Sequence, residues 1–331
     1  SEDNSFTYAR EIEETQLTKG KEACFQPAFS PDGKEIAYLA NRTEIRVMNL
    51  KSKKVRVVLP AKYNYSYQDG DQSFEWSPDG RWILAQYFEE GGWQHPDIAL
   101  VKADGKGEIH NLTNSGYSDS NPKWMMGGKA IIWYTDRQGL RSHGSWGAQG
   151  DIYGLFLDKE AYDYFTMSKE ERAFNKELKY QEAQKEAAEK AAESAKNKKK
   201  EDKKNNAKEN KKVDKKGNAD AAPANNAPKK QGDKASSIPE LKLDLENLEE
   251  RMVRMTINSS RLGDAVLTPD GNKLYYLAAF EGGYDLWVHD FENHSTRILS
   301  KIGRNGALEL SQDGRTLYLL SNGQVFTINQ G

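Results

Sequence analysis

The 331-residue sequence contains a single cysteine, Cys24, so it cannot form an intramolecular disulfide and is not a small disulfide-stabilised scaffold. It also lacks an apolar run of about 18–20 residues, the length that spans a bilayer as a helix. No signal-peptide pattern opens the chain, so the cellular location cannot be inferred from the N-terminal residues. These absences leave a globular chain held together by burial of apolar side chains, which make up 37% of its residues.

An excess of charge of one sign is also absent, since 48 Lys and Arg stand against 50 Asp and Glu. The distribution is nevertheless uneven. Residues 168–239 hold 20 basic and 13 acidic residues, and the rest of the chain holds 28 and 37. A nucleic-acid-binding protein concentrates positive charge on a folded face. An acidic body with one basic tract therefore argues against nucleic acid as a partner.

A short turn motif recurs along the chain. Three copies are close and one is looser, and a fifth is degenerate: Phe29-Ser30-Pro31-Asp32-Gly33, Trp76-Ser77-Pro78-Asp79-Gly80, Leu267-Thr268-Pro269-Asp270-Gly271, Leu310-Ser311-Gln312-Asp313-Gly314 and Trp124-Met125-Met126-Gly127-Gly128. Neighbouring copies lie 47 residues apart at Asp32 and Asp79, and 43 apart at Asp270 and Asp313. A period of roughly 40–50 residues is typical of the four-stranded blades of a β-propeller.

The residues between the turns have the alternating, β-branched and aromatic pattern of half-buried strands. A strand precedes each turn, a second follows it, a third opens on an acid or amide, as at Asp97, Asp151 and Asp285, and a fourth closes the unit. We therefore predict an all-β fold, a β-propeller formed by residues 1–166 and 241–331, with five visible blade units. Their predicted bounds are 19–60, 70–114, 119–166 continued by 245–257, 262–301, and 304–331.

The last unit lacks a fourth strand of its own. Residues 8–18 are a candidate, because Gln16-Leu17-Thr18 resembles the end of the second unit, Asn111-Leu112-Thr113. A strand from the start of the chain would close the ring and protect its edges. The alternative is that residues 8–18 belong to a preceding blade.

Residues 167–240 interrupt the third unit between its third and fourth strands. From Lys169 to about Lys199 the composition favours a helix, supported by acid–lysine pairs such as Glu186 and Lys190. The second half of the insertion has almost no large apolar residues and is predicted to be disordered. The simplest interpretation is a tolerated surface insertion. A tether, or a basic arm for an anionic membrane or cell-wall polymer, is the alternative.

Residues that carry chemistry are sparse. No Ser-His-Asp arrangement, Gly-x-Ser-x-Gly elbow, phosphate-binding loop or zinc-binding spacing is recognisable, so we predict no catalytic residue, no metal and no cofactor. The segment from Arg141 to Gly147 places a histidine among serines and glycines in a long loop. Loops on one face of a propeller often contact ligands. Arg141, His143, Ser145 and Trp146 are therefore the candidate binding residues, against the simpler interpretation of an ordinary connecting loop.

The Ser-Pro-Asp-Gly repeats, followed by strands that open on Asp-Ile or Asp-Leu, resemble TolB-like propellers. Three stretches are more specific: Phe74 to Gly80, Leu140 to Gly147, and Leu245 to Arg251 running into Thr256-Ile257-Asn258-Ser259-Ser260. They resemble the second propeller of bacterial Tricorn-like serine peptidases of the Bacteroidota type. The similarity covers the chain outside the insertion, and relatives carry a lysine-rich loop at the same place.

This resemblance implies a periplasmic or exported multidomain hydrolase, with tandem propellers, a PDZ-like domain and a serine peptidase domain. The family's catalytic residues would lie beyond Gly331, so none is assigned here. Its propeller would guide or gate peptide or protein substrates and dock the neighbouring domains, and a homo-oligomer is compatible with it. Family propellers have six or seven blades, so five units leave ring closure open.

Two alternatives remain. One is a free-standing TolB-like interaction propeller in the periplasm. The other is the propeller of a prolyl-oligopeptidase-type enzyme.

Overall fold

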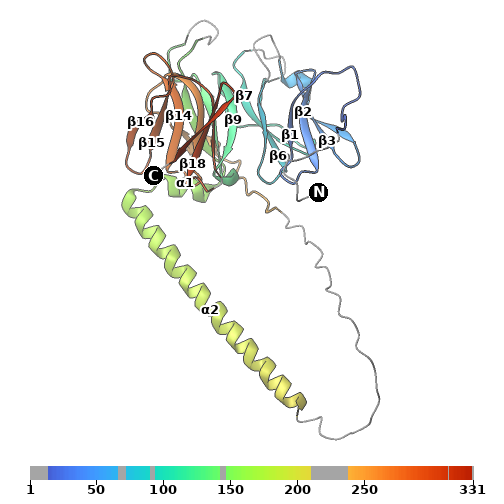
Figure 1. The fold of residues 1–331 in the computed structure, drawn as a ribbon, viewed down its shortest axis with the longest axis vertical. Helices are drawn as coiled ribbons and strands as arrows, with labels where there is room; N and C mark the ends of the chain where they lie inside the picture. The colour runs from blue at the N-terminus through green and yellow to red at the C-terminus, as the bar shows by residue number, and fades with distance from the viewer. Residues whose placement is uncertain are drawn as a thin grey trace. The chain divides into compact units, whose positions relative to one another are not determined.

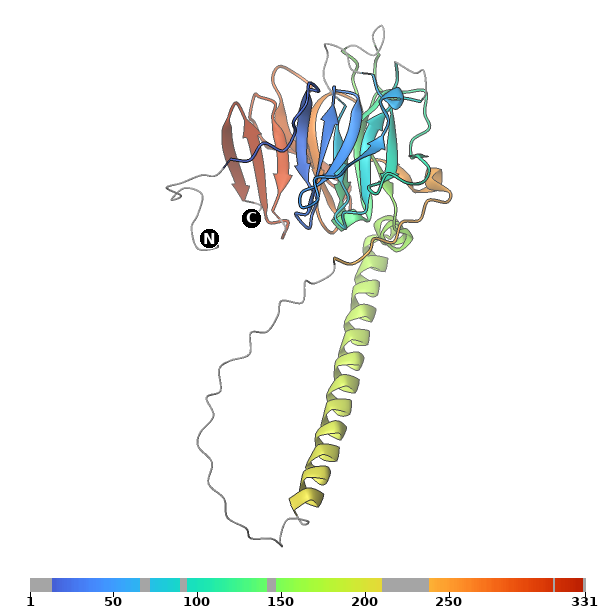
Figure 2. The same ribbon diagram turned by 90° about the vertical axis from the view of Figure 1, so that its right-hand side faces the viewer.

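The computed structural model describes residues 14–65, 72–89, 94–141, 147–209, 238–311 and 313–329. The chain forms two compact units, Ser1–Phe165 with Ile238–Gly331, and Thr166–Ser237. The first unit is built of strands, which Figures 1 and 2 show as a row of twisted sheets standing beside one another. The second contains a long helix.

Five antiparallel sheets make up the first unit, and they correspond to the five predicted blades. Blade 1 is β1 (Cys24–Phe29), β2 (Glu35–Ala40), β3 (Glu44–Asn49) and β4 (Val55–Leu59). Blade 2 is β5 (Phe74–Trp76), β6 (Trp82–Tyr87), β7 (Asp97–Lys102) and β8 (His110–Asn111). Blade 3 is β9 (Asp119–Met125), β10 (Ala130–Thr135), β11 (Asp151–Phe156) and β12 (Met252–Arg254). Blade 4 is β13 (Arg261–Leu267), β14 (Lys273–Ala279), β15 (Asp285–Asp290) and β16 (Ser295–Ser300), and blade 5 is β17 (Ala307–Leu310), β18 (Thr316–Ser321) and β19 (Gln324–Asn329).

The recurring turn joins the first two strands of a blade through one repeated set of hydrogen bonds. In blade 1 the Ser30 hydroxyl donates to Asp32 Oδ1 at 2.8 Å and accepts the Glu35 N–H at 2.9 Å, while Asp32 Oδ1 accepts the Lys34 N–H at 3.1 Å. Equivalent hydroxyl–aspartate bonds of 2.6 Å occur in three other blades, at Ser77–Asp79, Thr268–Asp270 and Ser311–Asp313. The short polar residues of the motif therefore satisfy the turn's own backbone, as Asp and Ser commonly do.

The core lies between neighbouring blades. Leu39, Val47, Ile83 and Ala99 belong to one buried cluster between blades 1 and 2. Leu84, Trp133 and Leu155 belong to the cluster between blades 2 and 3, and comparable clusters lie between blades 3 and 4 and between blades 4 and 5. Each blade is thus buried by its neighbours rather than by itself, as in other repeat architectures.

Blade 3 holds the insertion. Helix α1 (Lys159–Thr166) follows β11 at once, and Asp158 begins it by accepting the Ala161 N–H at 2.7 Å on its side chain. This helix was not predicted. The chain returns along residues 238–247, where the Leu241 N–H donates to Asp79 of blade 2 at 2.9 Å. β12 then pairs with β11, in the register Tyr153 with Arg254.

Blade 5 has three strands within the described residues, in the order β17-β18-β19. The candidate closing strand, 8–18, is described only from residue 14, and residues 14–18 form no strand. Leu17 instead packs against a cluster on blade 1 that includes Ile36, Tyr38 and Met48. The Leu17 side chain is therefore partly buried by blade 1. Residues 8–13 of the candidate strand lie outside the described residues.

The second unit contains α2 (Lys169–Glu209), ten residues longer than the predicted helix. Phe174, Leu178 and Tyr180 are exposed on it, and Lys190 forms the expected ion pair with Glu186 at 3.4 Å. The residues predicted to be disordered after Glu209 lie outside the described part. In the described ranges, no helix has the length and apolar character needed to cross a bilayer.

Candidate functional site: the axial cavity

A cavity of about 500 Å³ lies between the first strands of blades 2 to 5, which we call the inner strands β5, β9, β13 and β17. β5 packs beside β9, and β13 beside β17, so the cavity walls come from strands far apart in the sequence. Each inner strand is the end strand of its own sheet. The edge of this strand that faces away from its own sheet therefore has backbone groups that are not paired with another strand. Such edges can accept an extended peptide. We refer to this space as the axial cavity.

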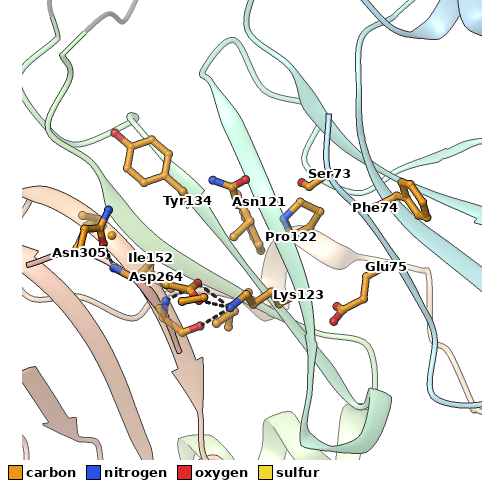
Figure 3. Close-up of a pocket in the computed structure, with 17 residues that line it drawn as sticks. Ser73, Phe74, Glu75, Asn121, Pro122, Lys123, Tyr134, Ile152, Asp264 and Asn305 are labelled. Atoms are coloured by element: carbon orange, nitrogen blue, oxygen red, sulfur yellow. Dashed lines mark hydrogen bonds and ion pairs between the residues drawn. The ribbon is translucent and has the colours of Figure 1, made fainter. Parts of the chain in front are cut away.

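The most prominent polar contact in the axial cavity is an ion pair across two blades. Lys123 of β9 places its ammonium 2.6 Å from each carboxylate oxygen of Asp264 on β13. Figure 3 shows the lysine reaching this carboxylate across the cavity. Asp264 Oδ2 also accepts the Leu308 N–H of β17 at 2.8 Å. One aspartate therefore joins the inner strands of three blades.

A second carboxylate, Glu75 on β5, lies on the opposite side of Lys123 in Figure 3. Its Oε2 accepts the Trp124 N–H of β9 at 2.7 Å, which links blades 2 and 3. Burial raises the pKa of Glu75 above its usual range, and the Trp124 N–H and the Lys123 charge oppose that rise. The protein therefore holds this carboxylate in a partly desolvated place where its charge is costly.

These contacts join the inner strands of blades 2 to 5, and a further polar contact extends the series to the first strand of blade 1, β1. The remaining link is between blades 2 and 1, where Trp76 Nε1 donates to the Ala28 carbonyl at 3.0 Å. Asn121 and Asn305 add amide groups to the cavity wall, and Tyr134 adds a ring whose hydroxyl donates to the Ala148 carbonyl at 3.3 Å. Burial raises the pKa of Tyr134 to about 12, so this hydroxyl stays protonated at neutral pH.

Of the predicted binding residues, the structure describes only Arg141, and Arg141 does not line this cavity. His143, Ser145 and Trp146 lie outside the described residues, and their role stays a prediction. Arg141 is described, and its guanidinium lies 4.9 Å from the centre of the Tyr117 ring. Arg137 contacts the same ring at 5.6 Å and bonds to Asp119. The described start of the loop is therefore held by cation–π contacts, each worth about 0.5–1 kcal/mol when exposed.

Histidine–hydroxyl contacts occur at two places in the described residues. His95 Nδ1 lies 3.3 Å from Ser118 Oγ, and His289 Nδ1 lies 2.7 Å from Thr296 Oγ1. Burial lowers the pKa of His289 below its usual value, which keeps its imidazole neutral. A hydrolytic triad needs an acid on the other ring nitrogen to orient the base, and no such hydrogen bond is found within the described ranges. Those ranges also hold no group of three potential metal-ligating His, Cys, Asp or Glu side chains.

Sequence reasoning missed the charged residues of the axial cavity. Glu75 lies in the stretch from Phe74 to Gly80 that resembles the Tricorn-like propellers, but the sequence did not identify Glu75, Lys123 or Asp264 as site residues. The signal that could have found them is a charged residue in a first strand whose neighbours are apolar. Such a charge is expensive unless it is paired or faces a cavity.

Comparisons with known proteins support the fold. No family model and no curated protein matches the sequence. Among solved structures, the tricorn protease matches with a TM-score of 0.50 and 12% identity over 92% of this chain. TolB from Acinetobacter baumannii matches with a TM-score of 0.46 and 15% identity over 94% of it, and TolB from Agrobacterium tumefaciens with 0.47 and 13% over 92%.

The chain spans only part of these proteins: 25% of the tricorn protease, 52% of the Acinetobacter TolB and 71% of the Agrobacterium TolB. The match to the tricorn protease confirms the predicted resemblance to Tricorn-like propellers at the level of the fold. This chain is a β-propeller of the kind found in the tricorn protease.

Proposed function

We propose that the chain is the non-catalytic propeller segment of a Tricorn-like serine peptidase, and that its axial cavity admits peptide segments on their way to or from a peptidase domain. One observation carries the proposal: a cavity of about 500 Å³ is walled by the end strands of four separate sheets. Its volume falls within the roughly 300–1,000 Å³ of small-ligand pockets. Binding there would be by strand edges and a few polar side chains, without bond chemistry.

The outer face of blade 5 supports the docking part of the proposal. Leu320 is 51% exposed there, Tyr318 is 37% exposed, and Val325, which lies opposite Leu320 on the next strand, is 65% exposed. In blades 2 to 4, by contrast, both sheet faces contribute to buried clusters shared with a neighbouring blade. An uncovered apolar sheet face is typical of an interaction surface, and a neighbouring domain of the same polypeptide would cover it. Such a parent protein would be periplasmic or exported.

The experiment for the cavity uses a photo-reactive extended peptide and mass spectrometry of the purified chain. Cross-links are expected on the inner strands, at residues 73–75, 121–123 and 262–265. Ala307 lines the cavity with an exposed side chain, so Ala307→Trp should fill space and reduce labelling. Ala61→Trp, at an exposed alanine outside the cavity lining, is the matched control. Labelling spread over the surface, or unchanged in Ala307→Trp, would reject the cavity as the peptide site.

The non-catalytic part of the proposal has its own assay. The purified chain should cleave neither casein nor a peptide library. Serine-dependent hydrolysis by the chain would contradict it.

The alternative is a free-standing TolB-like interaction propeller in the periplasm, which shares the same fold. The reading frame after Gly331 separates the two. A continuing frame with PDZ-like and peptidase motifs supports the peptidase segment, and a stop codon supports the free-standing module.

A further inference from the structure

The formal charges that line the axial cavity do not cancel. Lys123 has its counter-charge in Asp264, at 2.6 Å from both oxygens. Within the described ranges, Glu75 accepts one hydrogen bond, from the neutral Trp124 N–H at 2.7 Å. The described residues of the cavity wall therefore carry two carboxylates, Glu75 and Asp264, against one cation, Lys123.

The surplus carboxylate is also desolvated. Burial is the largest influence on Glu75 and disfavours its charged form. A ligand cation that entered the cavity would restore the electrostatic stabilisation that water supplied. Because water is partly excluded, such a charge-assisted hydrogen bond is stronger than one on an open surface.

We infer that the axial cavity prefers cationic peptide segments, with a lysine or arginine side chain or a free amino terminus placed beside Glu75. The inference rests on the proposed function, since it assumes that peptides enter the cavity at all. A peptide is the favoured form of the cation because the cavity is walled by end strands, whose edges are not paired with another strand. A lone carboxylate already bonded to an N–H is a poor metal site by comparison.

The test measures binding of short peptides to the full chain by calorimetry. The probes are acetylated, amidated alanine pentapeptides with a central lysine, norleucine or glutamate. Norleucine matches the lysine stem without its charge. The lysine peptide should bind about tenfold more tightly than the norleucine peptide, as for one charge-assisted hydrogen bond, and the glutamate peptide more weakly than both. A norleucine peptide with a free amino terminus tests whether the terminal ammonium serves as well as the side chain.

Three variants locate the effect. Glu75→Gln keeps an oxygen for the Trp124 N–H and removes the charge, so the lysine preference should disappear while the norleucine peptide still binds. Asp264→Asn acts from the opposite wall and should reduce the preference, because Lys123 then stands against Glu75 alone. Glu309→Gln is the control, since Glu309 occupies the same motif position in blade 5 as Glu75 in blade 2 and lies outside the cavity lining.

The outcomes separate this inference from the proposed function. Equal affinity for lysine and norleucine peptides, or a lysine preference that survives Glu75→Gln, overturns the inference and leaves peptide binding intact. If none of the peptides binds, the proposed function fails and the inference with it. Circular dichroism of each variant ensures that the propeller is folded in every comparison.

Discussion

Asp151 and Arg254 form an ion pair 2.9 Å long although 103 residues separate them in the sequence. Asp151 opens β11, before the insertion, and Arg254 ends β12, after it. The same carboxylate, which is fully buried, also accepts the hydroxyls of Thr256 at 2.6 Å and Ser259 at 2.7 Å. One aspartate of β11 thus binds β12 and the residues that follow it, which come after the insertion.

We predict that Asp151→Ala is strongly destabilising. It removes the carboxylate that accepts from the Arg254 guanidinium and the Thr256 hydroxyl. Removing one partner of a buried pair costs about 3–5 kcal/mol, and we expect the lower end of that range because the Arg254 side chain is 34% exposed. The loss should show in urea unfolding of the whole propeller. Hydrogen exchange should rise most at residues 252–256, where the fourth strand of blade 3 is attached.

Asp285→Ala is the matched control, because Asp285 opens β15 at the same place in blade 4. Among the described residues, the Asp285 carboxylate accepts one hydrogen bond, from the Ile302 N–H at 3.1 Å. A single hydrogen bond is worth about 1 kcal/mol, so this variant should cost much less. Equal losses in the two variants would show that the contacts with Arg254, Thr256 and Ser259 contribute little.

Much of the fold was predictable because the repeated turns and strands depend on residues that are close together in the sequence. The Pro-Asp-Gly turns and the alternating second and third strands are local, and β7, β11 and β15 begin at Asp97, Asp151 and Asp285 as predicted. The fourth strands were less predictable. Residues 109–113 form only the two-residue strand His110–Asn111, because the Thr113 hydroxyl and the Ser115 N–H bond to Asp97 instead of extending the ladder. Such side-chain competition cannot be recognised without knowing which strands are neighbours.

The candidate site was less predictable than the fold, for the same reason. Glu75, Lys123 and Asp264 come from three blades, and only the packing of inner strands brings them to one cavity. Arg141, by contrast, attracted notice through the local composition of its loop. The local composition of a segment does not show which strands line the axial cavity.

Gly105→Ala should destabilise the propeller more than Gly33→Ala. Both glycines have positive φ, +73° and +68°, which costs an alanine about 1–2 kcal/mol. At Gly105 an added Cβ would also lie 2.5 Å from the Val57 carbonyl oxygen of blade 1, whereas open space surrounds Gly33. Relieving that overlap should add about 1–3 kcal/mol. Thermal and urea unfolding of the two variants measure the difference, and equal losses would mean that blades 1 and 2 separate easily there.

Acid should weaken the turn of blade 1 through Asp32. The Lys34 ammonium and the Ser30 hydroxyl lower the pKa of Asp32 to about 2, against about 3.9 in an unfolded chain. A lowered folded-state pKa stabilises the protein above pH 4, and this contribution is lost as the pH falls through 2. Between pH 5 and pH 2.5, Asp32→Asn should therefore lose less stability than the unmodified chain. Glu14→Gln, which removes the same charge outside the blades, is the control, and identical pH profiles for Asp32→Asn and the unmodified chain would contradict the prediction.

Deleting residues 181–236 should leave the propeller folded. β11 and β12 pair within one sheet, with Leu155 opposite Met252, and the deleted residues belong to the second compact unit. Shortening a connection changes its closure entropy slowly, so the free energy of unfolding should change by less than about 2 kcal/mol. Circular dichroism and thermal unfolding test this. A deletion variant without cooperative unfolding would show that the second unit stabilises the blades.

The place of the insertion also has a consequence for biosynthesis. Arg254 leaves the ribosome 103 residues after its partner Asp151. At about 5–20 residues per second, translation needs roughly 5–20 s to supply it. During this interval the edge of β11 has no strand to pair with, while blades 1 and 2 are already complete. The nascent chain would therefore carry an open sheet edge for seconds, a period in which a chaperone could protect it from pairing with another chain.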